Sequence, residues 1–104
     1  MRHEEERTIY MIKPGLLLGD VIRALRKLGL NPLLEEKPGG WLLEAAGSGR
    51  HVRILLTSET RRLRGLEVFG PVPVSRLRME AEGPEEFVRE LKRRLEIELL
   101  RCLG

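Results

Sequence analysis

The sequence predicts an α+β domain in which an antiparallel meander sheet carries two helices packed on one face, in the order β-α-β-β-β-β(β)-α. Two segments, 20–28 and 84–99, repeat apolar residues at the three- and four-residue spacing of a helix. Between them, short runs of alternating or apolar residues are separated by glycine-rich turns, which is typical of strands joined as hairpins. The length of 104 residues is that of one domain.

The chain begins with an expected strand and an expected helix. Residues 7–13 (RTIYMIK) are rich in β-branched and aromatic residues, and the Pro-Gly pair after them ends the strand. Asp20 suits the start of the helix, where its carboxylate can cap free N–H groups, and Gly29 suits its end. Residues 1–6 are mostly charged, so we expect a flexible tail at 1–6 followed by a single domain at 7–104.

The middle of the chain predicts the strands of the meander. Residues 33–36, 41–46 and 50–57 are short runs separated by the turns PGG and GSG. After an arginine-rich turn, residues 66–69 and 74–81 are predicted to form one or two further strands. Two prolines interrupt the start of the last run, which therefore lies at an edge or a bulge.

The final helix shows the strongest local signals. Pro84 suits its first position, and Glu85 and Glu86 suit its first turn, where acidic side chains favour the positive end of the helix dipole. Because two amphipathic helices cover only one face of a sheet, the other face is left open to water and to partners. We expect that open face to carry charged side chains, namely His51, Arg53, Arg76, Arg78, Glu35, Glu44 and Glu67.

In its element order the chain resembles one half of the TATA-box-binding protein fold, with a strand, a helix, an antiparallel meander and a long final helix. The resemblance covers most of the chain but rests on order alone, because no motif of that family matches residue by residue. That family's DNA-facing sheet is apolar, whereas the corresponding face here is predicted to be charged. The resemblance therefore implies a fold and lends no function.

Composition excludes several classes of protein. A single cysteine, Cys102, excludes an intramolecular disulfide, and with only two histidines the chain lacks the usual ligands of a zinc site. We expect no metal, no cofactor, no membrane segment and no secretory signal, and therefore a cytoplasmic protein. Many Glu and Arg residues beside few amides favour a thermophilic source, although high-GC codon usage produces the same bias.

Positive charge is concentrated in one part of the chain. Residues 50–78 contain seven arginines and two acidic residues, a local charge of +5 against +3 for the whole chain. Such clusters bind nucleic acid through phosphates. The candidate nucleic-acid-binding residues are Arg53, Arg61, Arg62, Arg64, Arg76 and Arg78. The alternative is a solvated face whose arginines pair across strands with Glu35, Glu44 and Glu67.

These observations predict a small, non-enzymatic binding module, because no catalytic motif or triad spacing is found. The leading hypothesis is binding of nucleic acid or another polyanion, and the lack of aromatics interleaved with the arginines argues against reading by base stacking. The first alternative is a protein–protein interaction or homodimerisation domain that uses the charged sheet face. A small-ligand binding domain is the second. Trp41 is either a core anchor or an interface residue.

Overall fold

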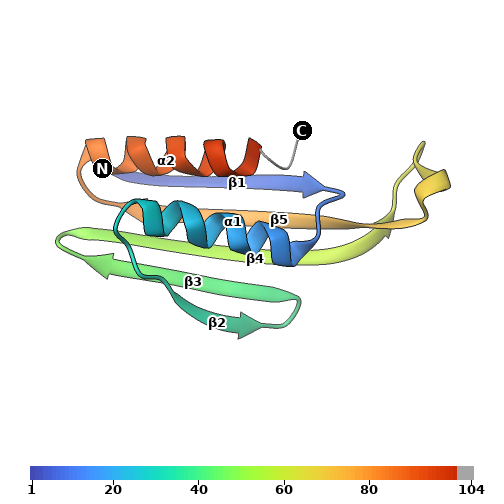
Figure 1. The fold of residues 1–104 in the computed structure, drawn as a ribbon, viewed down its shortest axis with the longest axis horizontal. Helices are drawn as coiled ribbons and strands as arrows, with labels where there is room; N and C mark the ends of the chain where they lie inside the picture. The colour runs from blue at the N-terminus through green and yellow to red at the C-terminus, as the bar shows by residue number, and fades with distance from the viewer. Residues whose placement is uncertain (101–104) are drawn as a thin grey trace.

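The computed structural model describes residues 1–100 and shows the expected element order (Figure 1). Cys102 lies outside the described residues. The elements are β1 (Arg2–Tyr10), α1 (Pro14–Lys27), β2 (Leu33–Lys37), β3 (Gly40–Gly47), β4 (Arg50–Arg62), the 3-10 turn η1 (Glu67–Phe69), β5 (Pro71–Glu82) and α2 (Glu85–Leu100).

The five strands form one antiparallel sheet in the order β1-β5-β4-β3-β2, and both helices pack on one face of it (Figure 1). The predicted α+β class and element order are therefore confirmed. Strands β2 to β5 are joined in sequence as a meander, and β1 adds to the far side of β5. The first strand thus lies beside the last, and the sheet has edges at β1 and β2.

The core lies between the sheet and the helices. From Val52 to Leu56 on β4 and from Ser75 to Ala81 on β5, every second side chain faces the helices and is buried, as the alternation of a half-covered strand requires. Helix α1 contributes Leu17, Val21 and Leu25, and α2 packs beside it through its own apolar stripe, made of Phe87, Val88, Leu91, Leu95 and Leu99. The opposite face of the sheet has no helix over it and is called the open face below.

A buried group of charges joins the two helices. The carboxylate of Glu98 on α2 is 2% exposed and accepts hydrogen bonds from Lys27 and Arg23 on α1. Arg23 also donates to Asp20, one turn earlier on α1, at 2.7 Å. Because both buried carboxylates have cationic partners, the group fixes how α1 lies against α2 without leaving a buried charge unpaired.

The first strand corrects the expectation for the N-terminus. Residues 1–6 are not a separate tail, because β1 starts at Arg2 and pairs with β5 as far as Glu82. The strand ends at Tyr10 rather than at Lys13, and Met11 follows it with a positive φ of 66°. Charged side chains alternate on both faces of β1, which hides the usual apolar pattern of a strand, whereas an edge strand tolerates such charges.

The two short hairpins follow from their turn residues. Pro38-Gly39 joins β2 to β3, with Gly39 at a φ of 77°, as in a turn with proline first and glycine second. Gly40, the next residue, passes so close to β4 that an added Cβ would lie 1.8 Å from the carbonyl oxygen of Leu56. The GSG turn between β3 and β4 forms the hairpin that its sequence predicts.

The longest hairpin, β4–β5, extends beyond the rest of the sheet (Figure 1). Pairing of β4 with β3 ends at Thr57, and pairing of β5 with β1 ends at Val74. Residues 59–73 therefore form a two-stranded projection, called the arm below. Residues 66–69 were expected to form a strand; they instead include η1, which lies in the loop at the tip of the arm.

Candidate functional site

The six candidate arginines do not lie together but divide into two groups. Arg53, Arg76 and Arg78 point from β4 and β5 onto the open face, within the five-stranded part of the sheet. Arg61, Arg62 and Arg64 belong to the arm. The two groups differ in their surroundings, and that difference decides which of them is available to a partner.

The sheet arginines are paired with glutamates of neighbouring strands. Arg76 Nε lies 3.0 Å from Glu6 Oε1, and Arg78 Nε lies 3.8 Å from the other oxygen of the same carboxylate. Arg53 Nε lies 3.7 Å from Glu44 Oε1. The pairing with Glu44 was expected from the sequence, whereas the pairing with Glu6 was not, because Glu6 belongs to the segment expected to be a tail.

The open face as a whole is balanced in charge. The strand register places these basic residues on it within the five-stranded region: Arg2, Lys37, Arg53, Arg76 and Arg78. The same register places these acidic residues among them: Glu4, Glu6, Glu35, Glu44, Glu80 and Glu82. Acidic side chains are thus at least as many as basic ones, so this face does not attract polyanions as a whole.

The arm arginines are less neutralised. Arg61 Nε lies 2.8 Å from Glu59 Oε1, an exposed pair of the kind that contributes about 0–1 kcal/mol. Neither Arg62 nor Arg64 forms an ion pair with any residue in the described range 1–100. Side chains alternate along a strand, so Arg61 and Arg62 point to opposite faces of the arm. Positive charge is therefore presented on both sides of the projection.

The tip of the arm is apolar and held in shape by its own backbone. Val68 and Phe69 are 88% and 59% exposed, although Leu63 and Leu66 in the same loop are partly buried. Glu67 accepts a hydrogen bond from the backbone N–H of Gly65 at 3.0 Å. This bond, together with one from its own N–H, lowers the pKa of Glu67, so its carboxylate stays ionised and bound to the turn.

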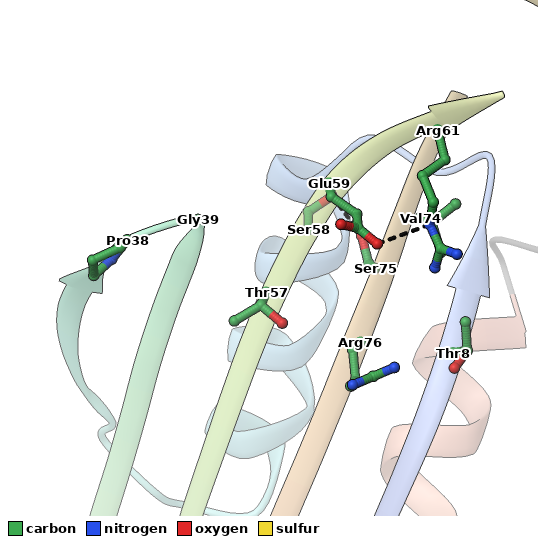
Figure 2. Close-up of a pocket in the computed structure, with 10 residues that line it drawn as sticks. All are labelled: Thr8, Pro38, Gly39, Thr57, Ser58, Glu59, Arg61, Val74, Ser75 and Arg76. Carbon is green, nitrogen blue, oxygen red and sulfur yellow. Dashed lines mark hydrogen bonds and ion pairs between the residues drawn. The ribbon is translucent and has the colours of Figure 1, made fainter. Parts of the chain in front are cut away.

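A hollow of about 270 Å³ lies where the arm meets the sheet (Figure 2). Figure 2 shows Arg61 and Arg76 extending from β4 and β5 towards β1, on which Thr8 lies. On the opposite, helix-facing side of the same two strands, the hydroxyl of Ser75 donates to that of Ser58 at 3.0 Å. Both arginines approach their glutamates through Nε, so their terminal nitrogens remain available to an anion at the base of the arm.

The remaining candidate residues lie elsewhere. Trp41 is on the helix-facing side of β3 and packs, partly buried, against the core. His51 lies on the open face, with Nε2 3.6 Å from Glu44 Oε2. Among residues 1–100, no three His, Cys, Asp or Glu side chains are grouped closely enough to hold a metal ion. No described helix has the length and apolar character that crossing a membrane requires.

Two comparisons with known proteins found no relative of this chain. No protein-family model matches the chain, and no curated protein matches it in sequence. Any function must therefore be argued from the arm, the hollow at its base and the open face.

Proposed function

We propose that the protein binds duplex nucleic acid by placing the arm against its phosphates. One observation carries the proposal: Arg62 and Arg64 have no acidic partner among the described residues, while the sheet arginines do. Unpaired guanidinium groups bind phosphate without first breaking an internal ion pair. The polyanion-binding region therefore shrinks from the whole arginine-rich stretch 50–78 to the arm and the hollow at its base.

The shape of the arm supports a groove as its binding place. A two-stranded β-ribbon can lie in either groove of duplex DNA. Arg61 and Arg62 lie on opposite faces of this ribbon, so each faces one of the two phosphate backbones that border a groove.

The positions of the aromatic residues favour a duplex over a single strand. Proteins that hold single strands stack successive bases on aromatic side chains of an exposed surface. Here Phe87 is buried and Trp41 faces the helices, so the exposed aromatic residues among residues 1–100 are Tyr10 at the end of β1 and Phe69 at the tip of the arm. One ring at the base of the arm and one at its tip do not form a platform on which successive bases stack.

Fluorescence anisotropy with a labelled DNA duplex of about 20 base pairs tests the proposal. The double variant Arg62→Ala/Arg64→Ala should lose at least about tenfold in affinity at 0.1 M salt, since two phosphate contacts are removed. The matched control, Arg53→Ala/Arg78→Ala, removes two exposed arginines that are already paired and lie outside the hollow, and it should change affinity much less. Absence of wild-type binding at about 50 mM salt would refute nucleic-acid binding.

A second candidate function, homodimerisation or docking of another protein, is favoured by the β2 edge. Leu33 and Leu34 are 79% and 49% exposed on this edge strand, and a shallow hollow beside it contains Leu42 and Leu55 on the open face. Unpaired edges with apolar side chains promote association of sheets. Light scattering should then show a dimer that Leu33→Lys weakens, and a monomer for the wild type would exclude self-association.

A further inference from the structure

We infer that Val68 and Phe69 act as an apolar wedge, which enters between two base pairs of the duplex and bends it. The inference rests on the proposed function and goes one step beyond it, from holding the duplex to deforming it. It depends on three properties of the tip: its exposure, its fixed shape and the charge beside it.

The exposure of the two side chains is the first property. Val68 is 88% exposed, more than any other large apolar residue of the described chain, and Phe69 next to it is 59% exposed. They lie on η1 at the far end of a molecule that measures 48 Å along its longest axis (Figure 1). Two adjacent apolar side chains at the end of a projection reach a partner before the rest of the protein does.

The fixed shape of the tip is the second property. The N–H of Phe69 donates to the carbonyl of Leu66, and the N–H of Gly70 donates to that of Glu67, both at 3.0 Å. The carboxylate of Glu67 is engaged with Gly65 rather than extended beside the apolar pair. A turn with these bonds presents Val68 and Phe69 in one orientation, so little order is lost when they insert.

The third property is the positive charge near the tip, which indicates a nucleic acid duplex as the partner of the apolar pair. Arg62 ends β4 and Arg64 lies in the loop that leads to the apolar pair, both without ion-pair partners among the described residues, and Arg61 precedes Arg62 on β4. Proteins that place basic side chains in the minor groove and insert an apolar side chain between base pairs unstack that base step and bend the duplex. Unstacking the two base pairs costs a few kcal/mol. The additional contacts between the bent duplex and the protein offset this cost. A DNA duplex is the expected partner because pyrimidine–purine steps in DNA unstack easily.

The experiment measures bending separately from binding. A DNA duplex of about 20 base pairs with one TA step at its centre carries a donor and an acceptor dye at its two ends. Saturating wild-type protein should increase energy transfer, because bending brings the ends together. Phe69→Ala should abolish this increase, while its dissociation constant rises by about tenfold or less, since the arginine contacts remain.

The matched control is Phe69→Leu, which keeps an apolar side chain at the tip and should still bend the duplex. Equal energy transfer with wild type and Phe69→Ala would overturn the wedge, and so would a bound duplex that stays straight. In both cases binding and its salt dependence survive, so the proposed function stands. No binding by any of the proteins would overturn both proposals.

The same variants test two other occupants of the tip, a lipid surface and a second copy of this chain. Co-sedimentation of the wild type with phosphatidylserine vesicles, lost in Phe69→Ala and without bending of DNA, would assign the tip to lipid and overturn the inference. A wild-type dimer in the absence of DNA that Phe69→Ala converts to a monomer would assign the tip to a second copy, with the same consequence. A monomer that bends DNA and ignores vesicles supports the wedge.

Discussion

The β4–β5 hairpin has two halves that share their strands but differ in their surroundings. The inner half of the hairpin, as far as Thr57 on β4, lies inside the five-stranded sheet, with helices over one face. Beyond Ser58 the hairpin continues alone as the arm, with no third strand on either side. The inner half shares the core under the helices and forms ion pairs with neighbouring strands. Among the described residues of the outer half, Val72 is buried and the ion pair is the one within β4, between Arg61 and Glu59.

The same difference explains the arginines. Arg76 and Arg78 are neutralised because β1 brings Glu6 to them, although these residues are far apart along the chain. Arg62 and Arg64 extend beyond β1 and β3, so no neighbouring strand supplies a carboxylate. An arginine cluster in the sequence therefore becomes a binding surface only where the fold leaves it without acidic neighbours.

The largest expected difference between the halves concerns stability. Val52, in the inner half, is 1% exposed, whereas Val68 in the arm is 88% exposed. Val52→Ala should lower the free energy of unfolding by about 2 kcal/mol, through lost burial and the cavity that remains. Val68→Ala should change it by less than about 0.5 kcal/mol, as exposed substitutions do. Urea denaturation followed by circular dichroism measures both values.

Equal effects of the two substitutions would contradict this division of the hairpin. A large loss for Val68→Ala would mean that the tip packs against the body of the protein. The arm would then be part of the core, and its apolar residues would need no partner.

A smaller effect is expected from the charges that hold the helices over the inner half. The hydrogen bond from Lys27, opposed by burial and aided by Arg23, lowers the pKa of Glu98 from its ordinary value of 4.5. A carboxylate with a lowered pKa stabilises the fold above its unfolded pKa, and this contribution is lost as the pH falls through the folded pKa. The stability advantage of wild type over Glu98→Gln should therefore shrink between pH 7 and about pH 3.

Thermal unfolding of both proteins across this range measures the effect. A difference in melting temperature that stays constant down to about pH 3 would show that the charge of Glu98 does not contribute. The arm has no part in this group of charges, so binding of DNA at neutral pH should be the same in both proteins.

The fold could be predicted from the sequence where periodicity is local. The stripe of α2 and the alternation along β4 and β5 mark which side chains are buried, and the glycine turns mark the hairpins. The start of β1 was missed because charges occupy both of its faces. Its pairing with β5 joins the two ends of the chain, and no local pattern records such a contact.

The candidate site could be predicted only in part, again because contacts between distant segments leave no local pattern. The arginines were identified by their number, but whether each is neutralised depends on strand register, as with Glu6 and Arg76. The arm did leave a signal, since Pro71 and Pro73 lack the N–H groups that a third strand would need. The mostly apolar residues 66–69 predict a strand, whereas the structure has a 3-10 turn there, because exposure at a tip is not visible in a sequence.

The salt dependence of DNA binding tests most directly the claim that the arm, rather than the sheet face, carries the phosphate contacts. With three contacts, from Arg61, Arg62 and Arg64, the logarithm of the affinity should fall by about 2.7 per tenfold rise in salt. Arg62→Ala/Arg64→Ala should reduce this slope to about 0.9, while Arg53→Ala/Arg78→Ala should leave it nearly unchanged. The opposite pattern, with the slope lost in the sheet variant and kept in the arm variant, would contradict the account.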